Sequence, residues 1–207
     1  MYLITDTAMC GLVGVPATVV AAVAAGVTAV QLRDPAATDD ELVALGRQVR
    51  TVLAGTGVPL LVNDRVHLVA AIGADGVHVG QFDLDIVQAR NILGDAPYLG
   101  LSVQDPAHVA AARAHGLGAV DYLGVGPVWG TATKPDHAPP GGVERLRRIS
   151  QMSPWPCVAI GGITAHRVPQ LRDSGVAGIA VVSAICGQPN IAAATSGLRQ
   201  SWEGTRS

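Results

Sequence analysis

PLLVNDRVHLVAAIGADGVHVG, residues 59–80, holds one complete strand and helix followed by the next strand. Residues 59–63 and 76–79 are short runs rich in branched apolar side chains, and they lack the polar alternation of a half-exposed strand. Such runs are typical of parallel strands that are covered on both faces. The segment 66–72 between them predicts a helix, and Gly73 follows its end, as glycine often does. The stretch therefore predicts a β-α-β unit.

The same alternation recurs along the whole chain, with a period of about 20 to 25 residues. Strands are predicted at residues 2–5, 29–33, 59–63, 76–79, 98–103, 122–125, 157–160 and 178–182, and helices near residues 16–25, 39–53, 66–72, 84–93, 107–115, 143–151, 165–173 and 190–201. Eight right-handed units of this kind close most naturally into a (β/α)8 TIM barrel, here of minimal size. The alternative, an open doubly wound sheet, would need a glycine-rich turn after the first strand, which residues 5–10 do not supply.

Length and composition indicate one compact domain, because 207 residues with 49 % hydrophobic and only 14 % charged side chains can bury a large core. We expect a single barrel over residues 1–207, with 202–207 as a disordered tail. The formal net charge of -2 gives no electrostatic footprint for nucleic acid or for an anionic membrane surface. The uncharged first helix could expose an apolar patch that a second subunit covers, so a homo-oligomer is an open expectation.

Cysteine usage predicts a reducing, cytoplasmic compartment. Cys10, Cys157 and Cys186 are odd in number, scattered, and without metal-ligand spacing. Asp6 lies where a signal peptide would be apolar. Residues 7–31 carry no charge, but their proline, glycine and threonine residues favour a small-residue helix and a buried strand over a membrane span.

The carboxyl ends of the predicted strands are where a barrel holds its catalytic side chains. Gln31 and Arg33 share one face of the second strand, so both can point into the mouth of the barrel. The alternative for Arg33 is a structural ion pair with Asp34 or with a carboxylate of a neighbouring loop.

Two carboxylates are expected to lie together at this end of the barrel. Asn63 and Asp64 follow the third strand, and Asp83 follows the fourth, which is its neighbour. Because no lysine lies beside them, a divalent ion would neutralise both, and hard oxygen ligands with room for phosphate oxygens suit Mg²⁺. The alternative for Asp64 is helix N-capping.

The segment GVGPVWGTATKP, residues 124–135, opens a long glycine- and proline-rich connection that predicts a mobile lid. Thr131 and Thr133 offer hydroxyl and N–H groups, and Lys134 is the only lysine of the chain. An anion site is expected here in preference to a solvated surface lysine. GGI at 161–163 and the serine after the eighth strand indicate a second phosphate site, with close strand-to-helix packing as the alternative for the glycines.

Motifs of common hydrolases and kinases do not occur in this sequence: GxSxG, HRD and Walker A patterns are all absent. The histidines lack HxxH or HExxH spacing, so structural or surface roles are expected for them. They are His67, His78, His108, His115, His137 and His166.

Over nearly its whole length the chain resembles the thiamine phosphate synthase family. The likeness rests on YLITD at 2–6, QLR at 31–33, VNDR at 62–65, IGADGVHVGQ at 72–81, GVGP at 124–127, GTATK at 130–134, AIGGI at 159–163 and VSAI at 182–185. It implies a transferase that joins 4-amino-5-hydroxymethyl-2-methylpyrimidine diphosphate to 4-methyl-5-(2-phosphoethyl)thiazole and releases diphosphate. Its partners would therefore be small-molecule substrates, and its cofactor Mg²⁺.

The resemblance also implies roles for individual residues. Gln31, Arg33, Asn63, Ser102 and Lys134 would hold the pyrimidine diphosphate, Asp64 and Asp83 the Mg²⁺, and Thr131, Ala132, Thr133, Gly162, Val182 and Ser183 the thiazole phosphate. Arg33 and Lys134 would act in catalysis, because they stabilise the charge that grows on the leaving diphosphate.

One position departs from the family pattern. The family usually has a lysine two residues after the arginine, where this chain has Pro35. A charged hydrogen bond is worth about 1.5 to 3 kcal/mol. Weaker binding of the diphosphate is therefore expected, unless Arg65 or another group substitutes.

Two other functions remain open from the sequence. A related thiazole tautomerase shares the fold and the thiazole phosphate site but needs neither metal nor diphosphate. A catalytically silent regulator that binds thiamine phosphate is the second alternative, and Pro35 is the feature that encourages it. Asp64, Asp83 and Lys134 together favour the synthase.

Overall fold

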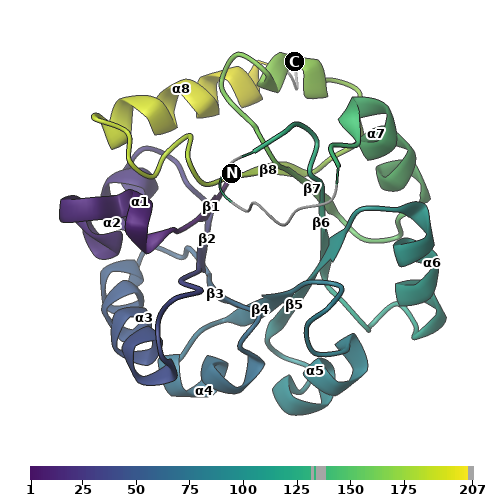
Figure 1. Ribbon diagram of the computed structural model, residues 1–207, viewed down its shortest axis with the longest axis horizontal. Helices are drawn as coiled ribbons and strands as arrows, with labels where there is room; N and C mark the ends of the chain where they lie inside the picture. Colours follow the sequence, from purple (N-terminus) through teal and green to yellow (C-terminus); the bar gives the residue numbers. More distant parts are fainter. Residues whose placement is uncertain (132, 134–138, 205–207) are drawn as a thin grey trace.

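Eight short parallel strands close into a barrel, which confirms the expected (β/α)8 fold (Figure 1). The computed structural model describes residues 1–131, 133 and 139–204. Each strand pairs with its neighbours in the sequence, and β1 pairs with β8 to close the ring. The strands are β1 (Tyr2–Ile4), β2 (Ala29–Leu32), β3 (Leu60–Asn63), β4 (Gly76–Val79), β5 (Tyr98–Val103), β6 (Tyr122–Val125), β7 (Cys157–Ile160) and β8 (Gly178–Val181). All lie within one residue of the expected bounds.

The helices surround the barrel (Figure 1). They are α1 (Thr7–Cys10), α2 (Val15–Ala24), α3 (Asp39–Leu53), α4 (Val69–Ile72), α5 (Ile86–Leu93), α6 (Pro106–Ala114), α7 (Gly142–Met152) and α8 (Ile191–Glu203), with 3-10 helices η1 (Gly11–Val13), η2 (Val66–Leu68) and η3 (Val168–Leu171). Local capping sets several of their starts. At α3, Glu41 N–H donates to Thr38 Oγ1, and Thr38 N–H donates to the Glu41 carboxylate, which forms a capping box.

Three segments differ from the sequence expectation. Residues 7–13 form α1 and η1, because the Asp6 carboxylate accepts the N–H of Met9 and starts a helical turn. The helix expected at 165–173 is only the 3-10 helix η3, since Pro169 has no N–H to continue an α-helix that begins at 165. The prediction of a disordered tail at 202–207 is wrong for its first residues, because α8 runs to Glu203 and the Trp202 side chain packs into the core. Residues 205–207 lie outside the described residues.

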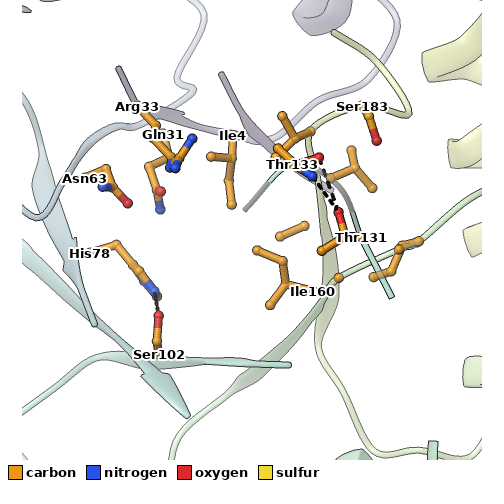
Figure 2. A pocket seen from close by; sticks show the side chains of 16 residues that line it. Ile4, Gln31, Arg33, Asn63, His78, Ser102, Thr131, Thr133, Ile160 and Ser183 are labelled. Carbon is orange, nitrogen blue, oxygen red and sulfur yellow. Dashed lines mark hydrogen bonds between the residues drawn. The ribbon is translucent and has the colours of Figure 1, made fainter. Parts of the chain in front are cut away.

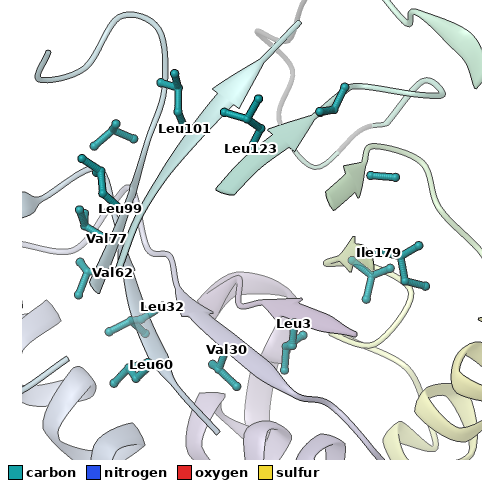
Figure 3. Close-up of a cluster of buried hydrophobic side chains, with 14 of the residues drawn as sticks. Leu3, Val30, Leu32, Leu60, Val62, Val77, Leu99, Leu101, Leu123 and Ile179 are labelled. Atoms are coloured by element: carbon teal, nitrogen blue, oxygen red, sulfur yellow. The ribbon is translucent and has the colours of Figure 1, made fainter. Parts of the chain in front are cut away.

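Side chains along each strand alternate between two layers. Val30 and Leu32 face the helices and belong to the large hydrophobic core between sheet and helices, part of which Figure 3 shows. Gln31, between them, faces the barrel interior, where Tyr2 and Leu61 belong to a small separate apolar cluster. The interior of the barrel is therefore partly polar, and its polar side chains lie below the carboxyl ends of the strands.

The helices of the described residues are short. No single helix among them is both long and apolar enough to cross a bilayer, and the one pair that passes together, residues 7–13 with 15–24, bends by 85°.

Candidate active site

A cavity opens at the carboxyl end of the barrel, and two polar walls face each other across it (Figure 2). Apolar side chains, among them Ile4 and Ile160, lie between the walls. The wall from β2 to β5 consists of Gln31, Arg33, Asn63, His78 and Ser102, and the wall from β6 to β8 includes Thr131, Thr133, Gly162, Val182 and Ser183. The residues that the family resemblance assigns to the two substrates thus lie around a single cavity, apart from Ala132 and Lys134, which are outside the described residues.

Arg33 fits both interpretations of the sequence. It lines the cavity, and its Nη1 lies 3.4 Å from the carboxylate of Asp6, in the loop after β1. The two side chains are only 17 % and 16 % exposed, so the pairing holds the guanidinium in place near the mouth. Asp34 makes a different contact, because its carboxylate accepts the N–H groups of Ala36 and Ala37 and shapes the loop after β2.

The β6 to β8 wall depends on two glycines with left-handed backbone. Gly161 and Gly162 have φ of 98° and 62°. A Cβ at Gly162 would lie 2.6 Å from the carbonyl oxygen of Gly130, so only glycine lets the loop after β7 approach the loop after β6 this closely. The close packing at these glycines is thus between two loops, whereas the alternative expected from the sequence was packing of strand against helix, and both glycines line the cavity.

Arg167 ties these two loops together. Its Nη1 donates to the carbonyl oxygen of Gly162 at 2.7 Å, and its guanidinium lies 5.4 Å from the centre of the Trp129 ring. Within the loop after β6, Thr133 N–H donates to Thr131 Oγ1 at 3.2 Å, which turns the two threonines toward the same part of the cavity. The start of the long connection is thus held against the β7 loop.

Asp64 and Asp83 lie at the ends of neighbouring strands but are not among the residues that line the cavity. Asp64 has φ of 60°, a conformation that costs free energy in a residue other than glycine, and its N–H donates to the carbonyl oxygen of His78. Arg65, not Asp64, is the N-cap residue of η2, which argues against the capping alternative. Asp83 Oδ2 accepts the N–H of Gly80 at 2.7 Å.

The donor chemistry at these two positions suits Mg²⁺. Both side chains carry hard oxygen atoms, and Asp83 Oδ1 makes no hydrogen bond to the part of the chain that the structure describes. In that same part, no group of three or more His, Cys, Asp or Glu side chains is placed to hold a metal. One or two carboxylates are what Mg²⁺ takes from a protein when substrate phosphate and water complete its shell.

The Arg65 side chain extends from the end of β3 to the segment that follows Pro35. Its Nη2 donates to the carbonyl oxygen of Ala37 at 2.5 Å, and its Nη1 lies 3.0 Å from the Asp39 carboxylate. The guanidinium therefore bridges the end of β3 to the start of α3. This is the group that could substitute for the missing lysine, although its present contacts are to protein.

His78 is the polar lining residue that the sequence interpretation did not single out. Its Nδ1 lies 2.9 Å from the Tyr122 hydroxyl, and its Nε2 lies 2.9 Å from Ser102 Oγ. The signal that could have found it is the pairing of β3 with β4, because His78 stands opposite Asn63 in the register and shares its face. A position inside the barrel at the strand end follows from that register.

Two tyrosines below the cavity keep their protons at neutral pH. Burial raises the pKa of Tyr2 to about 12, although hydrogen bonds with Tyr122 and Gln31 act in the opposite direction. Burial also raises the pKa of Tyr122 well above its ordinary value, and the neighbouring Tyr2 raises it further. Both hydroxyls are therefore neutral, and each has one hydrogen to donate.

Comparisons with known proteins agree on one family. A family model described as thiamine monophosphate synthase matches residues 1–185. A thiamine-phosphate synthase of Psychrobacter sp. (strain PRwf-1) is 47 % identical over 186 residues, 90 % of this chain and 87 % of that protein. One from Azorhizobium caulinodans is 42 % identical over 206 residues, 100 % of this chain and 96 % of that protein.

A solved structure gives the same result. Thiamine phosphate pyrophosphorylase from Pyrococcus furiosus superposes with a TM-score of 0.87 at 32 % identity, over 100 % of this chain and 96 % of that one. The match of the family model and the identity to these relatives extend over strands, loops and cavity alike. The chain therefore belongs to the thiamine monophosphate synthase family.

Proposed function

We propose that the cavity binds a pyrimidine diphosphate and a thiazole phosphate side by side and joins them as a thiamine-phosphate synthase does. The observation that carries the proposal is the pair of polar walls around one cavity, with apolar side chains between them (Figure 2). Family membership makes the chain a transferase, and its relatives carry the name of this activity. Two separate polar walls suit two anionic substrates better than one.

The pyrimidine diphosphate is assigned to the β2 to β5 wall. Gln31, Asn63 and Ser102 offer amide and hydroxyl groups for a heterocycle, and Arg33 offers a cation for the diphosphate. Lys134 would add a second cation. Asp6 supports this assignment, because its ion pair keeps the Arg33 guanidinium near the mouth before any anion binds.

The thiazole phosphate is assigned to the β6 to β8 wall. Thr131, Thr133 and Ser183 offer hydroxyl groups, and Gly162 and Val182 also line the cavity. Ala132 would contribute to the same wall. Glycine at 162 supports the assignment, since it lets the loop after β7 pack against the loop after β6, so that both loops line this wall.

The reaction requires no nucleophile from the protein. The bond between the pyrimidine methylene carbon and the diphosphate oxygen breaks, and its electron pair leaves with the diphosphate. The lone pair of the thiazole nitrogen then forms the new bond to that carbon. Arg33 and Lys134 stabilise the growing charge of the leaving group, while Ile4 and Ile160 keep water away from the electron-poor carbon.

Mg²⁺ is assigned to Asp64 and Asp83, where it would neutralise diphosphate oxygens when bound. Two hydrogen bonds support this assignment, because each holds a carboxylate after the end of a strand: Asn63 Nδ2 donates to Asp64 Oδ2 at 2.6 Å, and Gly80 N–H donates to Asp83 Oδ2. The chain itself supplies the two oxygen donors and the position next to the β2 to β5 wall.

The test is product formation from both substrates over a range of Mg²⁺ concentrations. Asp83→Asn keeps an oxygen that can accept the Gly80 N–H and removes only the charge, so we expect the Mg²⁺ concentration for half-maximal rate to rise at least about tenfold. Asp85→Asn is the matched control, because Asp85 lies in the same loop and its role is to cap α5 through Val87 N–H, which asparagine also does. An equal Mg²⁺ requirement in both variants would remove Asp83 from the metal site, and no product from the wild type would overturn the proposed function.

We also place the protein in the cytoplasm. Cys10, Cys157 and Cys186 are free and buried, which is the usual state of thiols in a reducing compartment. The proposed substrates are small molecules, and the proposal needs no macromolecular partner.

A further inference from the structure

Five side chains form a continuous hydrogen-bond path through the barrel interior, which we call the interior chain. Gln31 Nε2 donates to the Tyr2 hydroxyl at 2.8 Å, and the Tyr2 and Tyr122 hydroxyls lie 3.0 Å apart. Tyr122 contacts His78 Nδ1 at 2.9 Å, and His78 Nε2 contacts Ser102 Oγ at 2.9 Å. The path begins and ends on the β2 to β5 wall of the cavity, at Gln31 and Ser102.

Two glycines on the barrel strands leave space for the rings of Tyr122 and His78. A Cβ at Gly100 on β5 would overlap both the Tyr122 ring and His78. A Cβ at Gly124 on β6 would lie 2.9 Å from His78 Cε1. Glycine at these two inward-facing positions leaves the space that the rings fill, so the interior chain is a packed feature of the barrel.

The hydrogen-bond directions along the interior chain follow from its first member. Tyr2 accepts from Gln31 and has one hydrogen, and its other hydroxyl contact is Tyr122, so it donates to Tyr122. Tyr122 then donates to His78 Nδ1, which leaves the hydrogen on Nε2 to donate to Ser102 Oγ. The high pKa values of both tyrosines support this order, because neutral hydroxyls keep the hydrogen that the path needs.

The two ends of the interior chain consequently present opposite polarity to the cavity. Gln31 uses its amide nitrogen inside the barrel, which leaves Oε1 as an acceptor for a ligand. Ser102 accepts from His78, which leaves its own O–H to donate. A heterocycle bound at this wall would have to bring a donor to Gln31 and an acceptor to Ser102.

We propose that Tyr2, Tyr122 and His78 are positioning residues that make this wall select a 4-aminopyrimidine over the corresponding 4-oxopyrimidine. The inference rests on the proposed function. An aminopyrimidine carries an N–H donor next to ring nitrogen acceptors, whereas the oxo form carries a carbonyl acceptor next to a ring N–H donor. To exchange the donor and acceptor ends of this wall, all four hydrogen bonds of the path would have to reverse direction together, and the Gln31 amide would have to rotate.

The test compares kcat/KM for the aminopyrimidine diphosphate with that for its 4-oxo analogue. Wild-type protein is expected to prefer the amino substrate strongly, because a mismatched ligand leaves polar groups unpaired in the cavity. In Tyr122→Phe the path is cut at its centre and each end can turn independently, so the preference should fall by about tenfold or more. The KM for the thiazole phosphate, which belongs to the other wall, should not change.

Tyr98→Phe is the matched control, because it removes the same atom from a tyrosine that is 51 % exposed and lies at the amino end of β5. It should keep the wild-type preference. Tyr2→Phe cuts the path at a second point and carries the test if Tyr122→Phe does not fold. An unchanged preference in a folded Tyr122→Phe or Tyr2→Phe protein would overturn the inference alone, whereas a wild type that forms no product would overturn the proposed function.

Discussion

Replacing Gly100 by alanine should destabilise the barrel although it adds a single methyl group. A Cβ at this position would overlap the Tyr122 ring and His78 Nδ1. The Tyr122 ring is held from two sides, with its centre 6.0 Å from the Tyr2 ring and 5.4 Å from the His78 ring. It cannot make room without disturbing both contacts and the hydrogen bonds that accompany them.

Gly178→Ala provides the matched comparison, because Gly178 is also in a barrel strand and a Cβ there would meet nothing within 4 Å. Both substitutions lower the entropy of the unfolded chain by the same amount, so that contribution cancels between them. Overpacking costs about 1 to 3 kcal/mol, and one lost hydrogen bond costs about 0.5 to 1.5 kcal/mol. The free energy of unfolding of Gly100→Ala should therefore be about 1.5 to 4.5 kcal/mol below that of Gly178→Ala.

Urea unfolding of the two variants and the wild type, followed by circular dichroism, measures this difference. Gly178→Ala should be as stable as the wild type or up to about 1 kcal/mol more stable. A Gly100→Ala protein that matches Gly178→Ala would refute the reasoning, since it would mean that the Tyr122 ring relaxes freely toward the amino end of the barrel. The interior chain would then be too loosely packed to orient any group in the cavity.

Three further outcomes are expected. Pro35→Lys should lower the KM for the pyrimidine diphosphate about tenfold or more by restoring a charged contact, and an unchanged KM would contradict the expectation that a diphosphate contact is missing. Tyr2 has a folded-state pKa of about 12, above its value of about 10 when unfolded, so the folded state holds this proton more tightly. This difference in pKa contributes roughly 2 to 3 kcal/mol to the free energy of unfolding below pH 10, and the contribution is lost as the pH rises toward 12. Urea unfolding at several pH values should therefore show that Tyr2→Phe loses less of its free energy of unfolding over that range than the wild type does. Asp121→Ala removes the acceptor of Leu99 N–H at 2.7 Å and of Arg90 at 2.8 Å, so urea unfolding should show a loss of about 1 to 3 kcal/mol, with KM values unchanged because Asp121 lies at the amino end of the barrel.

Local spacing was enough to predict the strands because each apolar run is short, buried on both faces, and bounded by glycine, proline or polar residues. The same reasoning failed where a single residue decides the backbone. Pro169 reduces a helix to one 3-10 segment, and Asp6 starts a helical turn inside an otherwise featureless uncharged stretch. The core position of Trp202 was not predicted either, since tertiary contacts decide whether a residue near the end of the chain packs into a core.

For the candidate site, the topology of a barrel explains what could be predicted. Because all strand ends meet at one mouth, Gln31 and Asn63 could be placed in a common cavity from their positions alone, whereas Ser102 was assigned by the family resemblance. His78 was missed because its face depends on the register of β4 against β3, which a strand of four residues does not reveal. The contact of Arg33 with Asp6 joins two loops, and no local pattern specifies which carboxylate an arginine reaches.

The closure of β1 against β8 also limits how this chain can associate with others. Every strand in the described part of the chain has a partner on both sides, so its sheet has no edge to which a foreign strand could add. Fibre growth by strand addition would first have to open the barrel. An oligomer of the folded chain must instead use side chains outside the sheet, such as the exposed Leu12 of η1 and Val20 of α2.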